Sequence, residues 1–311
     1  MKEKLLILMG PTAVGKTAVS INLAKKLNGE IISADSMQIY KYMNIGTAKI
    51  QKDEMDGIPH YLIDIINPDD NFTVSDFKEN ANGYIKDINK SNKLPIVVGG
   101  TGLYINSLVY NLNFASVAPN NAIRDKLENW ANQHGNEYIH NILSQFDKES
   151  SERISINDRK RIIRALEIFE TTGKTMSDYN KNFRTTNDDY DLSMICLNMN
   201  RDKLYERINH RVDKMLEMGL IDEVKGILDM GYNKNLVSLQ GIGYKEIIMY
   251  LENEYSLNEA IEKIKQGSRN YAKRQLTWFR RDNRIKWIDV DDYNNVDDLT
   301  KAIEDLSINI L

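Results

Sequence analysis

The sequence predicts an α/β fold: a doubly wound parallel sheet with a P-loop at its core, and an all-helical domain inserted into that core. Three observations support this fold class. Short apolar segments alternate with helical segments, as in parallel strands joined by right-handed crossovers. A glycine-rich motif lies between the first apolar segment and the first helical one. Residues 119–186 have helical periodicity without intervening strands.

Six apolar segments predict the strands of this sheet. They cover residues 4–9, 30–33, 60–66, 95–98, 190–199 and 284–289. The helices expected around them cover residues 17–28, 73–89, 201–218, 243–251 and 257–282. We therefore assign residues 1–118 and 187–311 to one P-loop α/β core that ends in helices.

Residues 119–186 are expected to form the inserted helical domain. Apolar side chains recur there at helical spacing in three groups. The groups are Ile123, Leu127 and Trp130; Ile139, Leu143 and Phe146; and Ile162, Leu166 and Phe169. A polar segment from residue 171 to residue 189 precedes the strand with which the sheet resumes.

Composition narrows the class of protein. The chain has 311 residues, 41% hydrophobic and 28% charged, as expected of about two globular domains. The apolar segment at residues 5–9 is too short for a membrane span or signal peptide, and no window of about 20 apolar residues follows. The single cysteine, Cys196, excludes an internal disulfide and a Cys-x-x-Cys zinc site. A cytoplasmic protein without zinc is expected. The net charge of −4 argues against a wholly basic nucleic-acid coat but not against local basic patches.

The glycine-rich motif matches the P-loop pattern G-x-x-x-x-G-K-[ST]. It consists of Gly10, Pro11, Thr12, Ala13, Val14, Gly15, Lys16 and Thr17. The glycines allow backbone N–H groups to surround a phosphate, and the following helix adds the positive end of its dipole. Lys16 is expected to neutralise a phosphate, and the Thr17 hydroxyl to ligate Mg²⁺ bound to the same phosphates. The alternative is an ordinary turn between a strand and a helix.

The motif does not by itself indicate ATP, because it binds a diphosphate whatever the rest of the ligand is. A nucleoside triphosphatase usually has a second apolar strand that ends in a carboxylate. The best candidate strand here, residues 94–98, is followed by Gly99, Gly100 and Thr101. The absence of a carboxylate weakens the motor-ATPase interpretation, although several small-molecule kinases also have glycines at this point.

A carboxylate follows the second predicted strand. Asp35 is expected near the P-loop, because ligands of open α/β sheets bind beyond the carboxyl ends of the strands. It either accepts a proton from a nucleophile that attacks next to the bound diphosphate or forms a turn. Thr101, at another strand end, either contributes its hydroxyl to this crevice or caps a helix.

Nine segments along the chain resemble one family. They are GPTAVGKT (10–17), SADSMQIY (33–40), IGTAKI (45–50), PHYLID (59–64), VGGTGLY (98–104), NDRKRIIRALEI (157–168), RINHRVDKML (207–216), GIGYKE (241–246) and YAKRQLTWFRRD (271–282). In these segments the sequence is similar to the tRNA isopentenyltransferase family, the bacterial tRNA dimethylallyltransferases. The segments follow the family's order over nearly the whole chain.

The resemblance implies transfer of a dimethylallyl group from dimethylallyl diphosphate to the exocyclic N6 amine of the adenosine at tRNA position 37, next to the anticodon. Thr12, Lys16, Thr17 and Arg211 would hold the departing diphosphate with Mg²⁺, and Asp35 would be the general base. The core would be the catalytic domain, and the partner would be a tRNA anticodon stem-loop. The target base would be extruded to reach the site. We expect a monomer. The role of Arg207 stays open, and His60 is expected to be structural.

Two basic segments also bear on the partner. Arg153, Arg159, Lys160, Arg161 and Arg164 form the first, and the second covers residues 269–286. Each segment alone is typical of a solvated helix face, but the resemblance places both near the tRNA. The residues that it assigns to tRNA binding are Asp35, Ser36, Met37, Gln38, Thr101, Arg159, Lys160, Arg161, Ile162, Ile163, Gly241, Gly243, Lys245, Lys273 and Arg274.

Three other functions remain as alternatives. An isopentenyltransferase that acts on free adenine nucleotides would need no surface for an anticodon stem-loop. A small-molecule P-loop kinase would use Asp35 as the base for a substrate hydroxyl and would turn over a nucleotide. A non-enzymatic RNA-binding module would have no use for Lys16 or Asp35.

Overall fold

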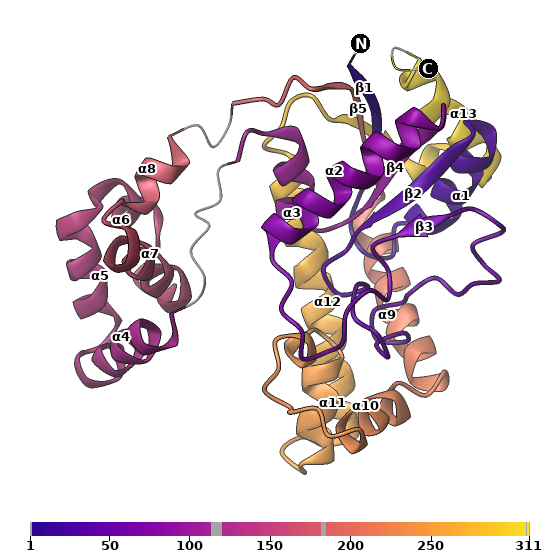
Figure 1. The fold of residues 1–311 in the computed structure, drawn as a ribbon. Helices are drawn as coiled ribbons and strands as arrows, with labels where there is room; N and C mark the ends of the chain where they lie inside the picture. Colours follow the sequence, from indigo (N-terminus) through magenta and orange to yellow (C-terminus); the bar gives the residue numbers. More distant parts are fainter. Residues whose placement is uncertain (1, 113–119, 182–184, 309, 311) are drawn as a thin grey trace. The chain divides into compact units, whose positions relative to one another are not determined.

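The computed structural model describes residues 2–112, 120–181, 185–308 and 310. The chain divides into two compact units, Met1–Leu108 with Asp188–Leu311 and Val109–Asn187 (Figure 1). Residue 119, where the sequence analysis places the start of the helical domain, lies outside the described residues. In the part of the chain that the structure describes, no helix combines the length and the apolar character needed to cross a membrane.

Within the described residues of the first unit, six parallel strands form one sheet in the order β3-β2-β4-β1-β5-β6. Their bounds are β1 Glu3–Met9, β2 Gly29–Ala34, β3 His60–Tyr61, β4 Leu94–Gly99, β5 Tyr190–Asn198 and β6 Lys286–Asp289. The predicted α/β class and the six predicted strand positions are therefore confirmed. Residues Leu5 to Met9 of β1 are completely buried, which explains why this strand is apolar without alternation.

Strand β3 is much shorter than the predicted segment 60–66. Leu62 and Asp64 adopt the left-handed conformation, with φ of 62° and 55°, so the extended backbone cannot continue. Ile66 instead forms an isolated bridge with Tyr40. The prediction of a strand up to residue 66 is wrong because hydrophobicity alone does not register these backbone turns.

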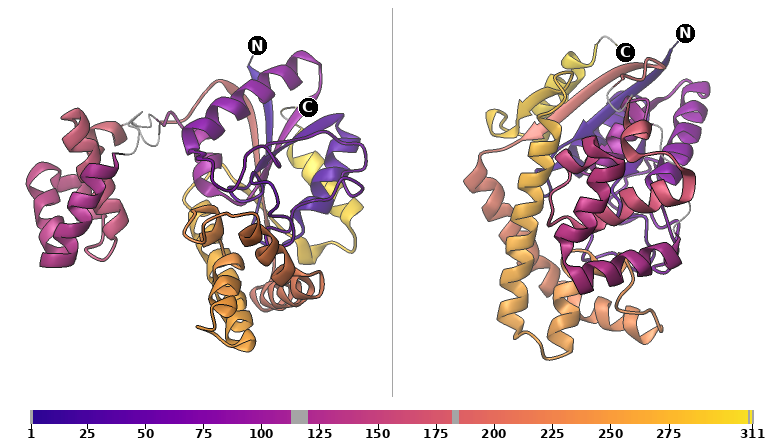
Figure 2. Two further views of the ribbon diagram at one scale, coloured as in Figure 1. Left: turned by 60° about the horizontal axis from the view of Figure 1, so that its bottom comes forward. Right: turned by 90° about the vertical axis from the view of Figure 1, so that its left-hand side faces the viewer.

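Helices cover both faces of the sheet. Helix α1 (Lys16–Lys26) packs with α13 (Val296–Leu306) on one face, and α2 (Val74–Lys90) packs on the other. The two further views show the sheet between these layers (Figure 2). Beyond the carboxyl ends of the strands, α9 (Arg201–Glu217) and α12 (Leu257–Phe279) lie side by side (Figure 1). They are joined through α10 (Leu220–Asp229) and α11 (Tyr244–Leu251).

The remaining helices of the first unit differ in how far the sequence predicts them. Helices α9 (Arg201–Glu217), α11 (Tyr244–Leu251) and α12 (Leu257–Phe279) confirm three predicted helices. Helices α3 (Gly102–Val109), α10 (Leu220–Asp229) and α13 have no counterpart in the prediction. Only Met218 and Gly219 separate α9 from α10. Gly219 adopts the left-handed conformation, with φ of 97°, and so interrupts the helix between them.

The second unit contains five helices among its described residues. They are α4 (Asn121–His134), α5 (Asn136–Phe146), α6 (Lys148–Arg153), α7 (Arg159–Thr172) and α8 (Met176–Asn180). Leu127, Ile139, Leu143, Ile162 and Leu166 form the centre of their apolar core. The three groups at helical spacing thus correspond to α4, α5 and α7, whereas α8 lies in the polar segment 171–189, for which no helix is predicted.

Candidate active site

The P-loop connects β1 to α1 at the carboxyl edge of the sheet. Gly15 precedes the helix in the left-handed conformation, with φ of 106°, which a glycine adopts without steric penalty. A Cβ on Gly10 would lie 2.8 Å from the Leu197 carbonyl oxygen of β5, so this position has no room for a side chain. The Lys16 Nζ donates hydrogen bonds to the carbonyl oxygens of Gly10 and Pro11, each at 2.9 Å. The lysine is thus folded over its own loop.

A cavity of about 330 Å³, which we call the P-loop cavity, opens in front of this loop. Four cationic side chains line it, namely Lys16, Arg207, Arg211 and Lys214, and Asp35 is the acidic residue among its lining residues. Such an excess of positive charge favours a polyanion such as a diphosphate. Burial lowers the pKa of Lys16 to about 8, against the opposing effect of Asp35. Burial also lowers the pKa of Arg211.

Arg207, whose role the sequence leaves open, belongs to this cavity. Its guanidinium nitrogen Nη2 lies 3.6 Å from the position that a Cβ on Gly15 would occupy. It is one helical turn before Arg211 on α9, so both guanidinium groups extend from the same helix face toward the P-loop.

A second cavity of about 340 Å³, which we call the apolar cavity, adjoins the first. The two have five lining residues in common: Thr12, Asp35, Thr47, Arg211 and Tyr271. Apolar side chains of the second cavity are those of Met37, Ile208, Val212, Met215, Ile242 and Ile264. An anion-binding space and an apolar space therefore meet at Asp35.

Several predicted residues are placed in or beside these cavities. Ser36, Met37, Gly241, Gly243 and Arg274 line the apolar cavity, and Gln38 lines the P-loop cavity. The Asp35 Oδ1 accepts a hydrogen bond from the Met37 N–H at 2.9 Å, so Asp35 forms a turn while it faces both cavities. The Thr101 Oγ1 accepts a hydrogen bond from the Ser36 N–H at 3.1 Å, which ties the ends of β4 and β2 together.

Sequence analysis does not identify Gln275 as a site residue, although it lies in one of the quoted segments. This buried side chain on α12 lines the P-loop cavity. Its Oε1 accepts a hydrogen bond from the Thr12 N–H at 2.9 Å, and its Nε2 donates one to the Gly100 carbonyl oxygen at 3.1 Å. One side chain thus joins the P-loop to the end of β4. Tyr271, one turn earlier, lines both cavities, and burial raises its pKa to about 12.

In the second unit, Arg153 of the first basic segment ends α6, and the other four residues of this segment lie on α7. Lys160 and Arg161 are exposed, whereas the Arg159 guanidinium donates hydrogen bonds to Asn132 and Asn136. Ile162 and Ile163 are buried in the core, so their side chains do not face solvent. In the other unit, Lys245, Lys273 and Arg274 are exposed.

Candidate metal ligands are few. Among the described residues there is no group of three or more His, Cys, Asp or Glu side chains that could hold a metal ion. Thr17 lines the P-loop cavity at the start of α1. One hydroxyl beside an anion-binding cavity fits Mg²⁺ that is held mainly by phosphate oxygens and water.

His60, which the sequence analysis expects to be structural, contacts the Ile58 carbonyl oxygen through Nδ1, and burial lowers the pKa of its imidazole.

The parallel sheet, the glycine-rich loop before α1 and the basic cavity define a P-loop α/β protein. Within that class, residues 38–282 match the IPP transferase family, and the chain belongs to this family. A curated tRNA dimethylallyltransferase of Alkaliphilus oremlandii (strain OhILAs) is 52% identical over 303 residues, which cover 97% of this chain and 96% of that protein.

Solved structures agree with this family. The full-length tRNA isopentenylpyrophosphate transferase of Bacillus halodurans, known from a crystal structure, is 44% identical and has a TM-score of 0.72. The match covers 99% of this chain and 98% of that one. A eukaryotic dimethylallyltransferase, described as acting on tRNA, is 31% identical with a TM-score of 0.79. That match covers 92% of this chain and 74% of the eukaryotic one.

Proposed function

We propose that this chain transfers a dimethylallyl group from dimethylallyl diphosphate to the N6 amine of the adenosine at position 37 of tRNA. The observation that supports this reaction most directly is the meeting of a basic and an apolar cavity at Asp35 and Arg211. A diphosphate, an allylic group and a base can then share one site. The 52% identical relative is named a tRNA dimethylallyltransferase.

In this proposal the diphosphate of the donor occupies the P-loop cavity. Lys16, Arg207 and Arg211 supply positive charge there. The bond between the allylic C1 and the diphosphate oxygen breaks, and its electron pair stays with the diphosphate. Cations that are already in place stabilise this developing charge without reorganisation, so they lower the barrier.

Mg²⁺ would be held by Thr17 together with diphosphate oxygens. When bound, the ion neutralises part of the negative charge of the leaving group. Lys16 and Thr12, which line the same cavity, would hold the same group.

The acceptor adenine enters through the apolar cavity after its extrusion from the anticodon loop. Its N6 nitrogen forms the new bond to C1, and Asp35 takes the proton that N6 loses. Apolar walls around the reacting carbon exclude water, which would otherwise capture the allylic cation. Thr101 holds the segment that follows Asp35 through Ser36.

The exposed basic side chains favour tRNA over a free nucleotide as the acceptor. Lys160 and Arg161 in one unit, and Lys245, Lys273 and Arg274 in the other, are exposed to solvent, where phosphates can reach them. Arg161 also forms an ion pair with Asp158 at this surface. A free adenine nucleotide or a kinase substrate would need neither set. We place the reaction in the cytoplasm and expect a monomer.

One assay tests the proposal. Purified protein, Mg²⁺ and labelled dimethylallyl diphosphate are incubated with tRNA, AMP or ATP in parallel. We expect label on tRNA alone. Label on AMP but not on tRNA would contradict the choice of acceptor, and ATP hydrolysis without label transfer would indicate a kinase-like protein.

A further inference from the structure

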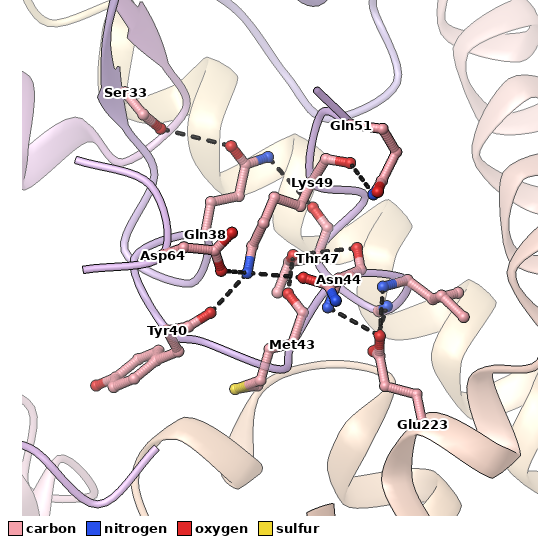
Figure 3. Close-up of polar contacts among 12 residues, drawn as sticks. Ser33, Gln38, Tyr40, Met43, Asn44, Thr47, Lys49, Gln51, Asp64 and Glu223 are labelled. Atoms are coloured by element: carbon pink, nitrogen blue, oxygen red, sulfur yellow. Dashed lines mark hydrogen bonds and ion pairs between the residues drawn. The ribbon is translucent and has the colours of Figure 1, made fainter. Parts of the chain in front are cut away.

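Glu223 on α10 binds a loop that it does not belong to. Its Oε2 accepts hydrogen bonds from the N–H groups of Asn44 at 2.8 Å and Ile45 at 2.7 Å. Its Oε1 accepts one from the Gly46 N–H at 3.1 Å and one from the Tyr244 hydroxyl at 2.6 Å. Three successive backbone N–H groups thus converge on one carboxylate. Figure 3 shows Glu223 beside the loop at Asn44. Hydrogen bonds of this kind to an ionised acceptor are among the stronger ones in proteins.

Tyr244 also fixes this loop. Its side chain is completely buried, and its ring carbon Cε2 lies 2.5 Å from the position that a Cβ on Gly46 would occupy. Only a glycine fits at position 46 while the ring stays in place. Glu223 and Tyr244 therefore hold residues 44–46 by hydrogen bonds and by close packing at once.

Lys49 fixes the other end of the loop. Its buried Nζ donates to the Tyr40 carbonyl oxygen at 2.6 Å and to the Asn44 Oδ1 at 3.1 Å, and it pairs with Asp64 (Figure 3). The Lys49 N–H also donates to the Asn44 carbonyl oxygen at 2.9 Å. Residues 44–49, which we call the 44–49 loop, are thus anchored at both ends.

The 44–49 loop forms part of both cavities. Gly46 and Thr47 line the apolar cavity, and Thr47 and Ala48 line the P-loop cavity. Glu223 lines neither cavity, so any effect of this residue on a bound substrate must pass through the loop or through Tyr244, which lines the apolar cavity.

We propose that Glu223 is a positioning residue, which holds the 44–49 loop as the wall where the two cavities meet and so aligns the acceptor nitrogen with the allylic carbon. The inference rests on the proposed function for the identity of the aligned groups. The hydrogen bonds by which Glu223 holds the loop are observed in the structure and do not depend on the proposed function.

Glu223→Gln tests the proposal. The amide keeps the shape of the side chain, but its NH₂ group cannot accept a hydrogen bond, so at least one loop N–H loses its acceptor. We expect kcat for transfer to tRNA to fall by at least about tenfold, because small misplacements of reacting groups reduce rates strongly. The affinity for inorganic diphosphate, which contacts the P-loop, should stay within about twofold.

Hydrogen exchange supplies a second measurement that needs no activity. In Glu223→Gln the amides of residues 44–46 should exchange faster, while those of β1 and β4 keep their protection. Glu217→Gln, which changes an exposed glutamate at the end of α9, is the matched control and should alter neither quantity. Unchanged kcat, or unchanged exchange of residues 44–46, would overturn the proposal.

Tyr244→Phe keeps the test decisive if Glu223→Gln fails to fold. It removes one of the four hydrogen bonds to Glu223 and retains the ring over Gly46. We expect a smaller loss of kcat and faster exchange confined to the 44–49 loop; no change in the loop would count against the proposal. If the unaltered protein transfers no label to tRNA, the proposed function fails, whereas the exchange of residues 44–46 still decides whether Glu223 holds the loop.

Discussion

The Asp35 carboxylate partly offsets the burial that lowers the pKa of Lys16 to about 8. Both residues line the P-loop cavity: Lys16 follows the loop after β1, Asp35 follows β2, and β4 lies between these two strands in the sheet. A lysine with such a pKa is charged at neutral pH and loses its charge in the mildly alkaline range, well below an ordinary lysine at 10.5.

This pKa predicts the pH dependence of diphosphate binding. Above about pH 8 the free protein must take up a proton at Lys16 before the charged form can bind the anion. The Kd for inorganic diphosphate should therefore rise with pH and approach a tenfold increase per pH unit. Calorimetric titrations between pH 6.5 and 9.5 would measure it.

Lys16→Arg is the matched control for the titration, because a guanidinium stays charged throughout this range. Comparison of the two proteins at each pH cancels the ionisation of diphosphate itself. Parallel pH profiles for both proteins would remove Lys16 as the titrating group.

Asp35→Asn tests the proposed base. The asparagine oxygen can still accept the Met37 N–H, so the turn should persist, but an amide cannot take a proton from N6. We expect kcat to fall by about 10² to 10⁴, the usual contribution of a general base, while tRNA still binds through its phosphate contacts. Single-turnover label transfer and filter binding measure the two quantities. Asp69→Asn, at an exposed position, serves as the control, and retained turnover in Asp35→Asn would exclude Asp35 as the base.

The sheet could be predicted because each strand is a short local pattern. Lys16 and Asp35 could be located for the same reason, since Asp35 follows directly on a buried strand and Lys16 ends the short loop after another, so both must lie at the carboxyl edge. Helix α13 was missed although Leu299 and Ile303 have helical spacing, because the segment around them is rich in acidic and polar residues. The range predicted for strand β3 is too long because the positive φ angles of Leu62 and Asp64 cannot be recognised from the hydrophobicity of the sequence.

Gln275 and Glu223 show what a local pattern cannot reveal. Gln275 binds the N–H of Thr12, 263 residues away, and Glu223 binds loop N–H groups 177 to 179 residues away. In the sequence both are single polar residues on amphipathic helices. In the structure Gln275 is buried and Glu223 is half-buried, and neither the burial nor the distant partner of these side chains can be read from the local sequence.

The exposed pair Lys160 and Arg161 leads to a prediction about tRNA binding. Replacement of both by glutamine should weaken binding and reduce the slope of log K against log salt concentration by about 1 to 2, because two phosphate contacts and their released counterions are lost. Filter binding at several salt concentrations measures the slope.

Lys148→Gln with Lys174→Gln removes two exposed charges from the same unit and is the matched control. It should leave the slope nearly unchanged. An equal reduction by both double variants would indicate that only the net charge of the unit matters, and would remove Lys160 and Arg161 as specific contacts.

Glu167 is expected to stabilise the helical unit through its buried ion pairs. Its fully buried carboxylate accepts hydrogen bonds from Arg124 at 2.9 and 3.0 Å, from Arg164 at 2.6 Å and from the Asn120 N–H at 2.7 Å. Burial by itself raises the pKa of Glu167, but these hydrogen bonds outweigh it and hold the pKa below the usual 4.5. The stabilisation is therefore complete above pH 4.5 and is lost as the pH falls through the lowered value.

Glu167→Ala should reduce the stability of this unit by about 3 kcal/mol at pH 7, because it leaves two arginines without their buried partner. Glu170→Gln, which removes a surface ion pair with Lys126, should change it by less than about 1 kcal/mol. Hydrogen exchange of the α7 amides reports this unit alone, whatever the other unit does. The difference between the two variants should shrink as the pH falls below 4.5, since protonated Glu167 no longer contributes its charge. A difference that stays constant down to pH 3 would show that Glu167 stabilises α7 by packing and not by its charge.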